Sequence, residues 1–237
     1  MSEPKYKRIL LKLSGEALSA AGSTYDWDKL GAIAAEVKAL TDAKIEVGIV
    51  VGAGNIWRGR QGGNMDRVSA DRMGMVATVI NSMAIAEAIR GAGGKAVVMT
   101  AFTVGAFTEP FDSQKAIEYM QEGKVVVIGG GTGSPFFTTD TGAVLRAVEL
   151  KADAALFAKN IDGVYDADPK THPEAKKFDR LTYVEMIDRD LKAVDLTAAA
   201  MANDNALPIV CFALSDPHNI KRAADGENIG TVLERGN

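Results

Sequence analysis

The sequence predicts an α/β protein, a three-layer αβα sandwich with a mainly parallel central sheet. Short runs of β-branched residues alternate along the chain with longer segments of helical period, as in repeated β-α-β units. Most of these runs are continuously apolar, which is typical of strands covered by helices on both faces. The expected strands are Lys7–Leu13, Ile45–Val51, Lys95–Met99, Lys124–Ile128, Ala154–Ala158, Pro208–Phe212 and Thr231–Leu233.

Capping residues mark the expected helices between these strands. Asp26 can cap a helix over Trp27–Leu40, and Thr182 with Glu185 has the spacing of a capping box. No long linker, repeat or low-complexity tract interrupts the rhythm. The 237 residues are therefore expected to form one domain, 1–237.

For two further helices, the sequence predicts the two ends of one and the buried face of the other. Asp216–Pro217 is expected to open a helix that Gly226 closes. Met73, Met75 and Met83 are expected to form a core-facing stripe on a longer helix.

Composition limits the class of protein. The single cysteine, Cys211, lies in an apolar run without a partner, so neither a disulfide framework nor a thiolate metal cluster is expected. The charged start Met1–Arg8 and the lack of long apolar runs predict a soluble cytoplasmic protein with no membrane segment. A net charge of −4 and a pI near 5.3 argue against a nucleic-acid-binding surface.

Glycine-rich segments follow three of the expected strands, where α/β sheets bind their ligands. Lys12–Gly15 places a lysine and a turn after the first strand, and Gly52–Arg60 adds Arg58, whose planar fork matches phosphate geometry. Alone, the first segment is more readily an ordinary strand-to-helix turn with a solvated lysine. Together the segments predict phosphate binding by local geometry.

The third segment, Gly129–Asp140, is the most informative. It has four glycines in five positions, and since glycine loses much entropy on ordering, close approach of backbone to a ligand is the favoured reason. Thr138 and Thr139 fall at an expected helix start, where hydroxyls and free N–H groups suit a phosphate or a uracil edge. The alternative is a flexible loop followed by a helix cap. Farther along, Asp162–Pro169 suits a base and ribose, and alone it is as readily a surface loop.

Two common nucleotide-binding patterns are missing. Neither G-x-x-x-x-G-K-[ST] nor a G-x-G-x-x-G after the first strand occurs. This excludes phosphate-loop nucleoside monophosphate kinases and dinucleotide-binding dehydrogenases. Three glycine-rich strand ends instead predict a site wide enough for two phosphorylated ligands.

Taken in order, these segments resemble the amino-acid kinase superfamily and, within it, the bacterial UMP kinases. The resemblance extends over almost the whole chain and includes Asp71–Asn81, similar to the helix that binds a ribose through an aspartate, and Val194–Ala198, similar to a segment with an acidic residue near the reacting phosphates. It implies the amino-acid kinase fold, with the acceptor UMP site in the N-terminal part and the ATP site in the C-terminal part. It also implies Mg²⁺-dependent transfer of the ATP γ-phosphoryl group to UMP in pyrimidine biosynthesis, a homohexamer, and inhibition by UTP.

The same resemblance assigns residues to roles. The implied catalytic residues are Lys12, Asp168 and Asp195. The implied ATP-binding residues are Lys12, Leu13, Ser14, Gly15, Gly54, Arg58, Asn160, Tyr165 and Asp168. The implied UMP-binding residues are Ala53, Asp71, Thr132, Gly133, Ser134, Pro135, Phe136, Phe137, Thr138 and Thr139. No dedicated protein metal site is expected, since Mg²⁺ would sit on the ATP phosphates with mostly water ligands.

Phosphoryl-transfer chemistry gives these residues their expected tasks. Lys12 would meet developing charge on the transferred group, Arg58 the ATP phosphates, and Asp71 the UMP ribose. A UMP phosphate is already mostly dianionic at neutral pH and needs no general base. His172 and His218, outside the glycine clusters, are expected on the surface.

Three departures from the family pattern carry their own expectations. Ala53 replaces a usual glycine beside the UMP. A shortened segment at 157–161 leaves either Lys159 or Asn160 facing adenine, and we choose Asn160. Ser19–Asp26 lacks the glycine-and-phenylalanine segment of GTP-responsive relatives, so a weak or absent response to GTP is expected.

Two rival functions share part of this pattern. A carboxylate or carbamate kinase would share the fold and the ATP half, but Asp71 with the loop at 135–139 favours a nucleotide acceptor. A nucleotide-sensing regulator would bind UMP or UTP without turnover, and Lys12 argues against it.

Overall fold

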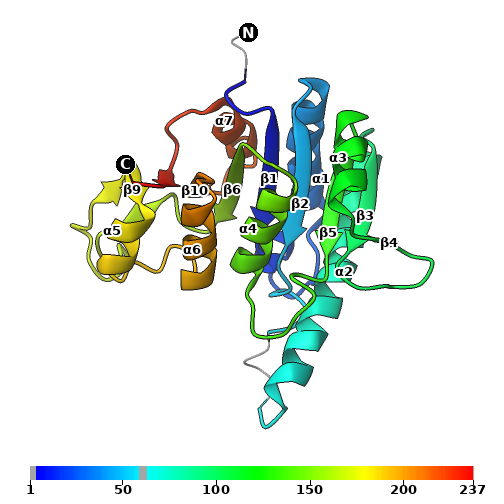
Figure 1. Cartoon of the computed structure of the whole chain (residues 1–237), viewed down its shortest axis with the longest axis horizontal. Helices are drawn as coiled ribbons and strands as arrows, with labels where there is room; N and C mark the ends of the chain where they lie inside the picture. Colours follow the sequence, from blue (N-terminus) through cyan, green and yellow to red (C-terminus); the bar gives the residue numbers. More distant parts are fainter. Residues whose placement is uncertain (1–3, 59–62, 237) are drawn as a thin grey trace.

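A nine-stranded sheet forms the centre of the computed structural model, which describes residues 4–58 and 63–236 (Figure 1). Its strand order is β4-β3-β5-β2-β1-β6-β10-β11-β9, and every neighbouring pair is parallel except β10 with β11. The strands are β1 Arg8–Leu13, β2 Glu46–Val51, β3 Ala96–Thr100, β4 Glu109–Pro110, β5 Val125–Gly129, β6 Ala154–Lys159, β9 Arg180–Thr182, β10 Ile209–Ala213 and β11 Thr231–Glu234. A separate antiparallel hairpin pairs β7 Val164–Tyr165 with β8 Lys177–Phe178.

All seven predicted strands are present, with each end within one residue of its expected position. The short strands β4, β7, β8 and β9 were not predicted, because two or three residues carry no period.

Helices cover both faces of the sheet, which confirms the predicted three-layer sandwich (Figure 1). They are η1 Gly15–Leu18, α1 Trp27–Asp42, α2 Arg67–Gly91, α3 Ser113–Gln121, α4 Thr139–Glu149, α5 Tyr183–Asp188, α6 Leu196–Asp204 and α7 Asn219–Asp225. Helices α1, α2 and α7 share one buried core with the sheet, whereas α3, α4, α5 and α6 share a second core on the opposite face. None of the helices in the described ranges is long and apolar enough to cross a membrane.

Strand β1 shows how continuous apolarity produces two cores. Ile9, Leu11 and Leu13 belong to the core under α1, while Leu10 belongs to the core under α4. Successive side chains point to opposite faces, so a strand buried on both faces must be apolar at every position.

The predicted caps are confirmed at two helices. Asp26 accepts a hydrogen bond from Lys29 N–H at the start of α1, and Thr182 with Glu185 forms the capping box of α5. These caps satisfy N–H groups that lack a partner within the helix.

The predicted opening of α7 is wrong, although its end is confirmed. The helix begins at Asn219, because the Asp216 carboxylate accepts from His218 N–H and closes a turn ahead of it. Gly226, at φ 83°, terminates the helix in the left-handed conformation expected of glycine.

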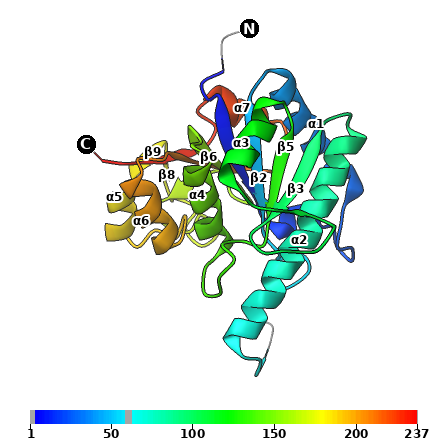
Figure 2. The same ribbon diagram turned by 45° about the vertical axis from the view of Figure 1, so that its right-hand side comes forward.

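The predicted core-facing methionine stripe on α2 is also wrong. Met73 and Met83 are each 43% exposed, while Met75 lines a pocket described below. The N-terminal part of α2 projects beyond the sheet (Figure 2), and the helix keeps an outward apolar face on which Val76 and Ile80 are also about half exposed. Composition cannot distinguish such a face from a buried one.

Candidate active site

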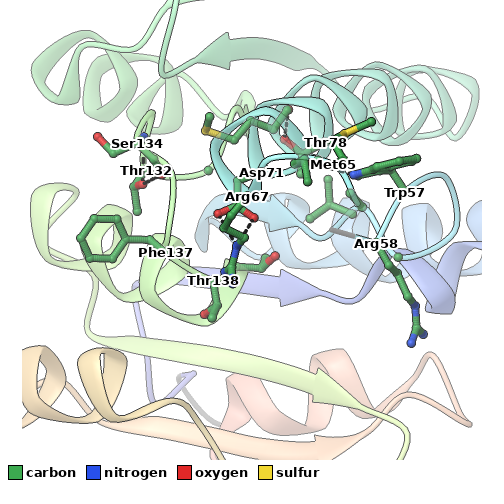
Figure 3. Close-up of a pocket in the computed structure, with 18 of the residues that line it drawn as sticks. Trp57, Arg58, Met65, Arg67, Asp71, Thr78, Thr132, Ser134, Phe137 and Thr138 are labelled. Carbon is green, nitrogen blue, oxygen red and sulfur yellow. Dashed lines mark hydrogen bonds and ion pairs between the residues drawn. The ribbon is translucent and has the colours of Figure 1, made fainter. Parts of the chain in front are cut away.

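A pocket of about 530 Å³, here the Gly-loop pocket, lies between the turn after β2, the start of α2, the loop after β5 and the start of α4 (Figure 3). Seven of the ten residues assigned to the UMP site line it: Ala53, Asp71, Thr132, Ser134, Phe137, Thr138 and Thr139. Gly133, Pro135 and Phe136 are in the same loop but outside the lining. The structure thus brings together segments separated by up to 86 positions in the sequence, from Ala53 to Thr139.

Asp71 ties the helix α2 to the loop after β5. Its carboxylate accepts from Arg67 Nε, at 2.9 Å to each oxygen, and from the Phe136 N–H at 2.8 Å. Figure 3 shows Arg67 lying against Asp71, with Arg58 directed away from them. Phe136 has φ 72°, a left-handed conformation that is unfavourable for a non-glycine residue, and it directs this N–H at the carboxylate.

The glycines of this loop are held from two sides. Gly130 N–H donates to Thr78 Oγ1 at 2.8 Å, and Gly131 O accepts from Arg146 Nη2 at 3.1 Å. Gly130 has φ 85°, and a Cβ there would lie 2.8 Å from the Phe102 ring. Backbone conformation and packing therefore require this glycine even before a ligand is considered.

The turn after β2 is held by buried amides. Asn81 Nδ2 donates to Gly52 O at 2.7 Å, and its Oδ1 accepts from the Tyr25 hydroxyl, also at 2.7 Å. A Cβ at Gly15 would lie 2.4 Å from Gly54 N, so the two glycine-rich turns are in direct contact. Asn81 ends the segment Asp71–Asn81 that resembles a ribose-binding helix, but its hydrogen bonds to the turn after β2 could not be predicted from its position in the sequence.

A charged cluster lies where β1, β6 and α4 meet. Lys12 Nζ is 2.9 Å from Asp140 Oδ1, and Lys159 Nζ is 3.8 Å from Asp140 Oδ2. Burial by itself would raise the pKa of Asp140, but the charges of Lys12 and Lys159 outweigh it and hold the pKa below its usual 3.8. Asp140 is thus ionised at neutral pH and is the counter-charge of the buried Lys12.

Sequence reasoning did not assign Asp140 a role. The structure explains the pair, because a lysine that is only 9% exposed requires an anionic partner. Lys159 also donates to the carbonyl of Ala193, so its ammonium is directed to the cluster. Lys159 and Asn160 both line the hairpin pocket described below, so the choice of Asn160 for the base stays a prediction.

Asp195 lies next to this cluster at the start of α6. It accepts from Ala198 N–H at 2.9 Å, from the Thr141 hydroxyl at 3.0 Å to each oxygen, and from the Thr138 hydroxyl. Thr138 also lines the Gly-loop pocket. We call Lys12, Asp140, Lys159 and Asp195 the junction.

Beyond the junction is a pocket of about 760 Å³, here the hairpin pocket, formed by the segment after β6, strand β7 and residues 189–193. The predicted ATP residues Asn160, Tyr165 and Asp168 line it. A smaller pocket of about 450 Å³ adjoins it, shares Lys159 with it, and is lined also by Asp140 and Asp195. Two ligand-sized cavities thus lie on either side of the junction.

Other predicted ATP residues lie elsewhere. Gly54 and Arg58 line the Gly-loop pocket, and Arg58 forms an ion pair with Glu16. Leu13 is fully buried in the core, so only its backbone can reach a ligand, and Ser14 caps η1. Gly59 and Arg60 of the second glycine segment lie outside the described residues.

Comparison with known proteins agrees with this geometry. Residues 7–213 match the family model described as the amino acid kinase family. The UMP kinase of Bacillus anthracis superposes with a TM-score of 0.94 at 37% identity, covering 98% of this chain and 97% of that one. The UMP kinase of Ureaplasma parvum gives 0.92 at 32% identity, covering 98% of this chain and 100% of that one.

A more distant structure shares the same architecture. The uridylate kinase of Archaeoglobus fulgidus has a TM-score of 0.75 at 31% identity, covering 95% of this chain and 99% of that one. With a family model that matches most of its length and relatives of this similarity, the chain belongs to the amino acid kinase family.

Proposed function

We propose that this protein is a UMP kinase that transfers the γ-phosphoryl group of ATP to UMP, giving UDP and ADP. The observation that carries the proposal is the junction, which has a ligand-sized pocket on each side. Thr138 lines one pocket and donates to Asp195, which lines the space adjoining the other. Two phosphorylated ligands can therefore meet at one charged centre.

The Gly-loop pocket is assigned to UMP. Its polar groups are fixed by contacts from separate elements, as Asp71 and Thr78 illustrate. A wrong base that leaves one such buried group unpaired loses about 1–3 kcal/mol of binding free energy. The UMP kinases of similar structure support uracil as the base.

The hairpin pocket is assigned to ATP, with its phosphates directed at the junction. Lys12 and Lys159 supply positive charge where negative charge develops during transfer, and Asp140 fixes the position of Lys12. Positioning and charge stabilisation supply most of the catalysis in phosphoryl transfer. No histidine is required: the side chains of His172 and His218 are 55% and 57% exposed on the surface, as predicted.

Mg²⁺ fits this site as a partner of the ATP phosphates. Within residues 4–58 and 63–236 there is no group of three metal-ligating side chains, and Mg²⁺ is commonly held by one or two carboxylates with phosphates and water. Asp140 is engaged by lysines, whereas the donors to Asp195 from the described part of the chain are hydroxyl and N–H groups. Asp195 is therefore the junction carboxylate available to a hydrated ion, which would neutralise phosphate charge.

Assembly and feedback belong to the same proposal. The exposed apolar residues Met73, Val76, Ile80 and Met83 form a stripe on α2 that supports self-association, with the homohexamer of the family as the expected state. UTP carries the same base as UMP and is the expected inhibitor.

The test is an ADP-release assay with ATP and each of UMP, CMP, AMP and GMP. UMP should be far ahead of the other three. Equal rates with CMP would contradict the choice of uracil. Turnover only with a carboxylate or carbamate acceptor would identify the rival kinase, and UMP binding without ADP release would identify a sensor.

A further inference from the structure

The Thr138 hydroxyl has no spare hydrogen-bonding capacity. It donates to Asp195 and accepts from the N–H groups of Asp140 at 3.0 Å and Thr141 at 3.2 Å. A hydroxyl has one proton and two acceptor lone pairs, so these three contacts saturate it. Any further ligand must displace one of them.

A phosphate that binds the Thr138 hydroxyl in the Gly-loop pocket can replace only one of its three hydrogen-bond partners, the carboxylate of Asp195. A dianionic phosphate has acceptor oxygens alone, so it competes for the single Thr138 proton. That proton is held by Asp195. Binding of the acceptor through Thr138 therefore requires Asp195 to release it.

Asp195 keeps two donors when Thr138 leaves. They are the Thr141 hydroxyl, 3.0 Å from both carboxylate oxygens, and the Ala198 N–H at 2.9 Å. Thr141 is only 2% exposed and does not line the Gly-loop pocket, so it touches Asp195 rather than the acceptor. Its hydroxyl is the one side-chain donor among the described contacts of Asp195 that the acceptor does not compete for.

We propose that Thr141 is a positioning residue for acceptor binding: it holds Asp195 and so frees the Thr138 hydroxyl for the acceptor phosphate. The inference rests on the proposed function. Without the Thr141 hydroxyl, Asp195 depends on Thr138 and withholds its proton from the phosphate. The carboxylate also carries more uncompensated charge next to an anion.

The test compares Thr141→Val and Thr141→Ser with wild type. Thr141→Val should raise the KM for UMP and the Kd for UMP about 10-fold, the scale of one hydrogen bond to a charged group, with a smaller change in the KM for ATP. Thr141→Ser keeps the hydroxyl and should restore UMP binding. A merely structural role would not separate the two KM values in this way.

Thr231→Val is the matched control. Thr231 is fully buried in β11, and its hydroxyl accepts from Val164 N–H and donates to Phe178 O. This variant should lower the thermal midpoint as Thr141→Val does but leave UMP affinity unchanged. If Thr141→Val does not fold, Thr141→Ala removes the same hydroxyl and replaces it in the comparison.

The outcomes separate this inference from the proposed function. Wild type that phosphorylates UMP, together with a Thr141→Val variant that binds UMP normally, overturns the inference alone. Equal losses of UMP affinity in Thr231→Val, or no recovery in Thr141→Ser, overturn it as well. Wild type that neither binds nor phosphorylates UMP refutes the proposed function and the inference with it.

Discussion

The two ligand pockets are held together in different ways. The walls of the Gly-loop pocket are joined by contacts between distant segments: Asp71 with Phe136, and Thr78 with Gly130. The wall of the hairpin pocket is joined largely by local contacts, such as the Tyr165 hydroxyl with Asp162 at 2.8 Å and Lys170 N–H with Asp168 at 3.0 Å. The hairpin pocket adds two long-range contacts to these local ones, Lys159 with the carbonyl of Ala193 and Val164 N–H with Thr231 Oγ1, whereas the contacts cited for the Gly-loop pocket all join distant segments.

This difference bears on selectivity. Groups held in place by several elements cannot move to accommodate a wrong ligand, so an unmatched polar group remains unpaired. Groups held only by local contacts in an exposed loop can move more easily to accommodate a different ligand. We therefore expect sharper discrimination at the acceptor pocket than at the donor pocket.

The largest expected effect belongs to the junction, which serves both pockets. Lys12→Ala should lower kcat roughly 100-fold or more and leave the KM for UMP little changed, because the charge acts most strongly in the transition state. Steady-state kinetics with both substrates varied will measure it. Lys38→Ala is the control, since Lys38 is a partly exposed lysine paired with Asp42 and lines neither pocket. An unchanged kcat with weaker nucleotide binding would make Lys12 a binding residue.

An intermediate effect should separate the two pockets. Asp71→Asn replaces an acceptor that receives Arg67 and Phe136 donors, and should raise the KM for UMP about 10-fold with the KM for ATP unchanged. Asp162→Asn changes a partly exposed contact with Tyr165 and Lys177, and should raise the KM for ATP by less than about five-fold, as for surface pairs. Equal effects of both variants would remove the distinction drawn between the pockets.

The smallest expected effect is the response to GTP. Within Ser19–Asp26, Thr24 O accepts from Asn55 Nδ2, so the segment supports the turn after β2 that borders the Gly-loop pocket. An effector needs a differential affinity of about 1–3 kcal/mol between two states, and no contact in this segment supplies it. GTP titrated at subsaturating ATP and UMP should change the initial rate less than about two-fold, well below what such a differential gives. A several-fold rise that saturates would contradict this expectation.

Most of the fold could be predicted because its signals are local. Continuous apolarity located β1, β2, β5 and β6, and cap chemistry located the start of α1. The outward face of α2 could not be predicted, since the reach of a helix beyond its sheet is a tertiary property. The opening of α7 lies two residues later than expected, because Asp216 accepts from His218 N–H, ahead of the helix, instead of capping it.

The part of the site that could be predicted consists of pocket-lining residues that lie next to one another in the sequence. Five residues of the loop at 132–139 line the predicted pocket, whereas Arg58 lines that pocket instead of the one assigned to ATP. Asp140 and Thr141 contact residues distant in sequence, Lys12 and Asp195 respectively, and no local pattern reveals such pairs. The roles of the site residues, Mg²⁺, the single-domain division and the hexamer stay predictions.

The left-handed backbone of Phe136 sets a rule for redesign of acceptor choice. Its ring is 64% exposed, so side-chain packing places little restriction on the residue that could stand there. The restriction comes from φ, which β-branched residues adopt poorly and which glycine, asparagine and aspartate tolerate. A combinatorial library of this loop should therefore limit position 136 to residues that tolerate a left-handed backbone. Side-chain chemistry should be varied at Phe137 instead.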